Sequence, residues 1–351
     1  MVKTIAKQAR LQQKVKVRGE KVVQQQRSDL EKAQECMQIA AFVHGYNDAI
    51  VSLANHALAS SHGFNAVDEY KYVQTTAAAA LILPMEDLKN ESGVRVALKL
   101  YQMAAEKGSK EAWFNLGHLY WTGHDRGQDG ADVVEENVPM ALKCFENAVD
   151  LGDDDARYFL SVYHLSQDDD GDGDGDGDGD DNNNARKRGL ALVQEAGDNG
   201  HAGALYYLAL LYRNGDAGLE IEPCLALFKE YLNEAADGDD ADALFMRAHC
   251  LFHGEDGYAV DMNAALDGFV KSGEAGNADG FVSAGAMYHH GGYEVKKDQR
   301  RAFELYQQAG ELGSIEGWKN VVACYALGEG VPRSEETAKY IAKTMLNGKD
   351  S

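Results

Sequence analysis

Small and large apolar residues recur in a fixed order along residues 91–346, at distances that fit α-helices. The order repeats around a turn residue, usually a glycine, with a basic period of about 36–37 residues and longer steps near the start. We number six repeats by these turn residues and count positions from each of them: Gly108, Gly152, Gly200, Asp239, Gly276 and Gly313.

Each repeat predicts two amphipathic helices that pack against each other. Positions −11, −7 and −4 share one helical stripe, and positions +4, +8 and +12 share another. Small residues at −4 and +4 let the two backbones approach closely, and large residues at −7, +8 and +12 fill the space beside them. The residues that we take as structural are Ala97, Ala141 and Ala302 at −11; Tyr101, Phe145 and Tyr306 at −7; Ala104, Ala148, Ala196 and Ala309 at −4; Ala112, Ala156, Ala204 and Gly317 at +4; Leu116 at +8; and Tyr120, Tyr212 and Tyr325 at +12.

Glycines predict where the helices end. A left-handed residue commonly terminates an α-helix, and glycine adopts that conformation without a steric penalty. We expect the turn glycines Gly108, Gly152, Gly200 and Gly313 to end the first helix of their repeats. A second glycine at +15 is expected to end the second helix, at Gly123, Gly215, Gly254, Gly291 and Gly328. One hairpin cannot bury its apolar stripe alone, so consecutive repeats should stack.

This pattern resembles the Sel-1-like repeat family, a relative of the tetratricopeptide repeats. The family's A-x3-Y-x2-A-A-x2-G-x3-A-x3-L-G-x2-Y-x2-G is carried by Ala97, Tyr101, Ala104, Ala105, Gly108, Ala112, Leu116, Gly117, Tyr120 and Gly123. The resemblance covers about residues 94–346. It implies an all-α, right-handed α-solenoid of about six helix-turn-helix repeats, which serves as a scaffold or adaptor for protein–protein interaction.

Three further segments are predicted: a basic tail at 1–27, a helical cap at 28–90 and an acidic insert at 166–185 within the repeat region 91–346. The insert contains DDDGDGDGDGDGDD between Asp168 and Asp181, a composition typical of a disordered linker. Some of its aspartates have EF-hand spacing. This spacing leaves a calcium-responsive module, or weak binding of divalent cations, as the alternative.

Charge narrows the choice of partner. The formal net charge is −23; residues 1–27 contribute +7 and residues 168–181 contribute −9, which leaves −21 for the remainder. Such a field repels a phosphate backbone, so we expect no nucleic-acid partner and favour protein partners with basic segments. The apolar runs are too short for a membrane span. No secretory leader is visible and the five cysteines form no C-x-x-C pair, so we expect a cytoplasmic protein, with mitochondrial or nuclear location as alternatives.

No residue set predicts catalysis, a cofactor or a metal site. His249 and His253 have the spacing of a metal-binding pair on a helix, but no third ligand follows at a suitable distance along the chain. Cys250 and Cys324 fall in an otherwise apolar column, which predicts packed core thiols. No motif pairs a nucleophile with a base. We therefore expect no enzymatic activity, and a hydrolase is the less favoured alternative.

Polar positions on the first helix of a repeat are the predicted partner contacts. In a solenoid these positions line the groove in which a peptide or partner domain can bind. They are Lys99, Gln102, Lys143, Asn147, Gln307 and Gln308.

Overall fold

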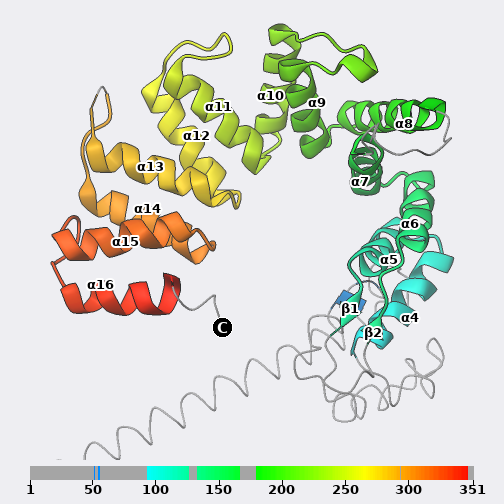
Figure 1. Cartoon of the computed structure of the whole chain (residues 1–351), viewed down its shortest axis with the longest axis horizontal. Helices are drawn as coiled ribbons and strands as arrows, with labels where there is room; N and C mark the ends of the chain where they lie inside the picture. The colour runs from blue at the N-terminus through cyan, green and yellow to red at the C-terminus, as the bar shows by residue number, and fades with distance from the viewer. Residues whose placement is uncertain are drawn as a thin grey trace, which may run out of the picture. The chain divides into compact units, whose positions relative to one another are not determined.

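The structure is a computed structural model that describes residues 51, 54, 55, 93–125, 133–166, 179–292 and 294–346. The predicted all-α repeat solenoid is confirmed, because within these residues thirteen α-helices follow one another and consecutive helices pack in pairs (Figure 1). The chain divides into two compact units, residues 1–156 and residues 157–351.

The N-terminal unit contains repeat 1 and the first helix of repeat 2. Helices α4 (Gly93–Glu106) and α5 (Lys110–Thr122) form a hairpin, and α6 (Val138–Asp150) packs on α5. Between α5 and α6, the strands β1 (His124–Asp125) and β2 (Val133–Val134) pair antiparallel, a feature that the sequence pattern did not predict. Of the predicted cap, Val51 and Ala54 are helical and buried in the same core as Ala97. The basic tail lies outside the described residues.

The C-terminal unit begins within α7 (Asp154–Leu165), the second helix of repeat 2. α8 begins at Gly179, inside the segment predicted as an acidic linker, whose residues 167–178 lie outside the described residues. α16 closes the array and continues as one π-helical turn, Ala342–Leu346. The other elements are α8 (Gly179–Asp198), α9 (Ala202–Asn214), a 3-10 turn (Ala217–Leu219), α10 (Leu225–Asp237), α11 (Ala241–His253), α12 (Met262–Glu274), α13 (Ala278–His290), α14 (Gln299–Glu311), α15 (Ile315–Leu327) and α16 (Glu335–Ile341).

The core follows the repeat columns. Position −7 supplies the large buried side chains, among them Phe145, which is fully buried, and Tyr306, which is 5% exposed. The tyrosines at +12 are half-buried. Completely or almost completely buried are Ala97, Tyr101, Ala104, Ala112, Leu116, Ala141, Ala148, Ala156, Ala196, Ala204, Ala302, Ala309 and Gly317.

Turn and cap residues fix where each helix starts and stops. The turn position has a positive φ in every repeat, +87° at Gly108 and +96° at Gly313, and even the non-glycine Asp239 has φ +59°. The next residue, at +1, is the N-cap of the second helix, a column that the sequence reading missed. Its side chain accepts a hydrogen bond from a backbone N–H of the first turn, which is the usual N-cap contact. These caps are Ser109, Asp153, His201, Asp240, Asn277 and Ser314.

Candidate partner-binding pocket

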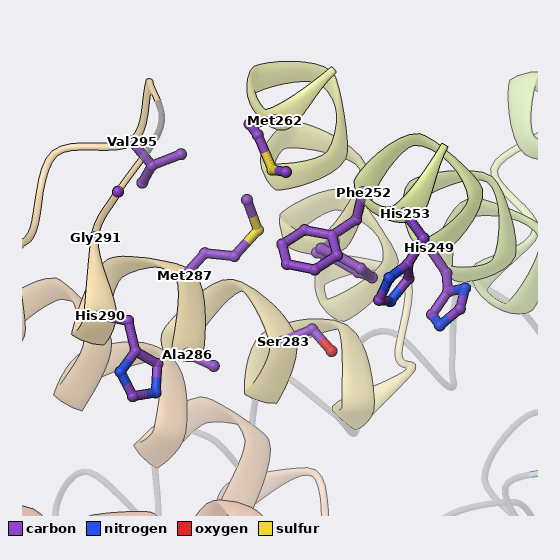
Figure 2. Close-up of a pocket in the computed structure, with 12 residues that line it drawn as sticks. His249, Phe252, His253, Met262, Ser283, Ala286, Met287, His290, Gly291 and Val295 are labelled. Atoms are coloured by element: carbon purple, nitrogen blue, oxygen red, sulfur yellow. The ribbon is translucent and has the colours of Figure 1, made fainter. Parts of the chain in front are cut away.

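A pocket of about 300 Å³ lies where repeat 4 meets repeat 5 (Figure 2). Its lining comes from the last turns of α11, from α12, and from α13 with the loop after it. The lining is mainly apolar, with one hydroxyl and three imidazoles. Its residues are His249, Phe252, His253, Met262, Phe269, Ser283, Ala286, Met287, His290, Gly291, Gly292 and Val295.

Helical spacing brings these side chains to one place. Phe252 and His253 follow His249 by three and four residues, so both lie next to it on the surface of α11. Ser283, Ala286, Met287 and His290 share a face of α13 in the same way. After α13, Gly291 has φ +65° and turns the chain away from the helix, and an antiparallel bridge between Gly292 and Val295 returns it to the pocket edge.

The wall on α11 is an aromatic cluster. The rings of His249 and His253 are 4.4 Å apart, and the ring of Phe252 lies 4.8 Å from His253 and 6.4 Å from Phe269. The pair that sequence spacing singled out therefore lies along one pocket wall with the two rings tilted at 47° to each other, while His290 lies on the opposite side (Figure 2). Among the described residues, no group of three or more His, Cys, Asp or Glu side chains could hold a metal ion.

The neighbouring repeat junctions show why this one is open. Position +13, near the end of the second helix, is occupied by Arg213, Phe252 and His289 in repeats 3, 4 and 5. Arg213 pairs with Asp256 of the next repeat at 2.8 Å and covers the Phe228 ring at 5.6 Å.

His289 has the same role at the following junction of the array. Its Nε2 lies 3.7 Å from Oε2 of Glu329 in the next repeat. At the pocket, by contrast, Phe252 stands at +13, and Gly292 stands at the position that corresponds to Glu329. Neither Phe252 nor Gly292 can form an ion pair. An apolar hollow lies where the neighbouring junctions have such a pair. This departure from the repeat is visible in the sequence, but only once the junction contacts are known.

The residues predicted to contact a partner are on the first helices of repeats 1, 2 and 6, and none of them lines this pocket. Gln102 donates to the Tyr120 hydroxyl at 3.3 Å, and Gln307 donates to Glu311 at 2.9 Å. Lys143 and Gln308 are exposed, whereas Lys99 and Asn147 are half-buried. The role of these six residues in binding stays a prediction.

Three of the described cysteines are buried thiols that are unsuited to nucleophilic chemistry. Burial raises the pKa of the Cys144, Cys250 and Cys324 thiols to about 11, so these thiols stay protonated at neutral pH. Cys224 is half-buried at the start of α10. His164, at a position where four of the other five repeats have tyrosine, is half-buried with its ring edge-on to Tyr163 at 5.5 Å.

No helix among the described residues has the length and apolar character needed to cross a membrane.

Family comparison agrees with the geometry. The sequence pattern of the family described as Sel1 repeat matches residues 19–41, 94–109, 111–153, 202–223, 241–277, 283–314 and 322–343, which is more than half of the chain. The chain belongs to the Sel1 repeat family. The match at 19–41 lies outside the described residues. Sel1 repeat proteins are typically scaffolds for protein–protein interaction, and the repeat is generally non-enzymatic.

Solved structures give the same fold. A Sel1 repeat protein from Oxalobacter formigenes is similar with a TM-score of 0.55 and 18% identity, over 90% of this chain and 86% of that one. The protein c5321 of uropathogenic Escherichia coli, a protective antigen with an SLR fold, has a TM-score of 0.50 and 19% identity. That match covers 90% of this Sel1 repeat protein and 64% of c5321. These identities show a common fold only. No curated protein matches the chain.

Proposed function

We propose that this Sel1 repeat protein is a non-enzymatic scaffold that binds a protein partner, and that the pocket between α11 and α13 is one contact point. The observation that carries the proposal is the open apolar junction at Phe252, flanked by two junctions that charged or polar pairs close. Apolar pockets with a few polar groups at their edge are typical binding sites.

The structure favours binding over catalysis at this pocket. Ser283 is its one hydroxyl, and the pocket is otherwise lined by methionine, phenylalanine, alanine and valine side chains with imidazoles. A nucleophilic serine needs a base within hydrogen-bond reach and donors for an oxyanion. No hydrogen bond joins Ser283 to His249, His253 or His290, and Figure 2 shows the serine apart from the histidine rings. The lining suits an inserted apolar side chain.

The repeat supplies a matched pair of variants that test the pocket. Ala286 lines the pocket at position +10 of α13, and Ala323 occupies the same position of α15. Ala286→Phe should fill the hollow, and Ala323→Phe adds the same ring to an exposed position. In pulldowns of tagged full-length protein from its own cells, we expect a stoichiometric partner that Ala286→Phe loses and Ala323→Phe retains. Circular dichroism and thermal melting check that both variants fold.

Photo-crosslinking locates the partner on the surface. A benzophenone amino acid is placed at position 253, which is exposed at the pocket edge, or at position 327, the matching +14 position of α15. A discrete adduct at 253 and none at 327 is expected. Equal binding by both phenylalanine variants together with no adduct at 253 would exclude the pocket as a contact. No reproducible partner in any of these experiments would contradict the scaffold function itself.

A further inference from the structure

The pocket is too small for an extended ligand, and charged side chains lie around its edge. Its volume of about 300 Å³ is at the lower end of the range for ligand pockets, so it can hold one large side chain and little more. Met262 and Met287 face each other across it (Figure 2). Methionine side chains adapt their shape and make favourable contacts with aromatic rings, which suits a ring or a branched aliphatic group as the guest.

The charge around the pocket is mostly acidic. Residues 249–298, which include every lining residue, contain eight acidic and three basic side chains, and one of the acids, Asp256, pairs with Arg213 outside this range. Two exposed carboxylates lie beside lining residues: Glu255 approaches His249 at 3.9 Å, and Glu294 accepts a hydrogen bond from Asn263, the neighbour of Met262, at 2.7 Å. Of the three basic residues, Lys271 pairs with Asp267 at 2.9 Å, while Lys296 and Lys297 follow Glu294 in the loop. The excess of acid attracts a cationic ligand.

We propose that the pocket accepts one large apolar side chain, aromatic or aliphatic, from a partner segment that carries basic residues beside this anchor. The inference rests on the proposed scaffold function and names the chemistry of its partner. The basic flanks lie near Glu255 and Glu294, at either side of the pocket. A peptide supplies both groups, because side chains two residues apart in an extended chain lie on the same face.

Methyl NMR of the full-length protein tests this directly. The chain has nine methionines, and Met262 and Met287 can be assigned by the variants Met262→Leu and Met287→Leu. The probes are the synthetic peptides acetyl-GKGFGKG-amide, acetyl-GKGAGKG-amide and acetyl-GEGFGEG-amide. We expect the first peptide to shift the Met262 and Met287 signals and leave distant methionines unchanged. Removal of the ring should abolish the shifts, and reversal of the flanking charge should weaken binding about threefold to tenfold at low salt.

Controls separate the possible occupants. Ala286→Phe should abolish the peptide-induced shifts, and Ala323→Phe should leave them intact. Equal binding of the lysine and glutamate peptides would overturn the basic-flank inference. Binding of free indole as tight as that of the lysine peptide would show a small-molecule site instead. Self-association of the wild type in ultracentrifugation, lost in Ala286→Phe, would show that a second copy is the occupant.

Failure of this proposal is distinguishable from failure of the scaffold function. If no peptide shifts either methionine while the photo-crosslink at position 253 still captures a partner, the ligand chemistry is wrong and the contact point stands. If peptides bind but no cellular adduct forms, the pocket has the proposed chemistry and the scaffold proposal loses its support.

Discussion

Two glycines of the α14–α15 hairpin should tolerate alanine very differently, although they are four residues apart. Gly313 has φ +96°, and a Cβ there would meet no atom within 4 Å. Gly317 is buried where the two helices cross. A Cβ there would lie 2.6 Å from the backbone nitrogen of Gly310, 2.8 Å from Cβ of Ala309 and 2.9 Å from the carbonyl oxygen of Tyr306. The first substitution strains φ, and the second forces two helix backbones apart.

The two effects differ in size. An L-residue in the left-handed region costs about 1–2 kcal/mol, which sets the penalty for Gly313→Ala. Overpacking a close contact costs about 1–3 kcal/mol, and Gly317→Ala should reach the upper end because two of its three nearest atoms belong to the backbone and cannot rotate away. Loss of glycine also reduces the entropy of the unfolded chain, by about 0.4–1 kcal/mol in both variants. This common effect cancels, so Gly317→Ala should be the less stable by about 1–2 kcal/mol.

Urea unfolding followed by tryptophan fluorescence measures the difference locally. The chain has three tryptophans, and Trp318 packs directly over Gly310 in the hairpin concerned. With Trp113→Phe and Trp121→Phe as the common background, the signal reports α14 and α15 alone. A midpoint for Gly317→Ala at or above that of Gly313→Ala would refute the argument, because it would mean that the helices separate without resistance at their closest approach.

Two further predictions concern other sites. Cys224 is the N-cap of α10, but its side chain makes no cap hydrogen bond. Its φ and ψ of −140° and 99° nearly equal those of Asp261, which does cap its helix. Cys224→Asp should therefore raise the free energy of unfolding by about 1 kcal/mol, and an unchanged melting temperature would contradict this. Burial raises the pKa of Tyr101 and Tyr306 from 10.0 to about 12, and that of the Cys324 thiol from 9.0 to about 11. Above pH 9 to 10, the folded chain therefore keeps protons that the unfolded chain releases. Stability should thus fall as pH rises from about 9 to 12, less steeply in Tyr306→Phe, and melting temperatures that stay level over this range would disprove the assignment.

The helices could be predicted well from the sequence because the same spacing of small, large and turn residues recurs in each repeat. A single small residue at −4 or +4 fits many structures. The same spacing in six copies fits only a helical hairpin. The turn position shows this best, since Asp239 adopts φ +59° where five repeats have glycine. Asp239 thus adopts the conformation that was predicted only for the turn glycines of the other repeats.

Contacts between repeats were harder to predict. Position +9 illustrates the difficulty: Gly117 lies so close to the next repeat that a Cβ would be 2.7 Å from the Phe145 ring, and Gly285 has the same relation to Tyr306. The pattern shows a small residue in this column but not which helix it faces. The pocket was missed for the same reason, because Phe252 and Met262 come from different repeats and only the stacking brings them together.

The junction positions can change at little expense to the fold, which makes them suitable places for binding sites to arise. The Arg213–Asp256 pair is partly exposed, with 31% and 20% of the side chains accessible, and ion pairs of this kind contribute about 0–1 kcal/mol. The columns at −4, +4 and −7 are buried and close-packed, so changes there are costly. At the pocket, Phe252 stands at the position of Arg213, a change that removes little stability and leaves an apolar lining. In an array of near-identical hairpins, the junction that departs from its neighbours is therefore where binding specificity is most readily built.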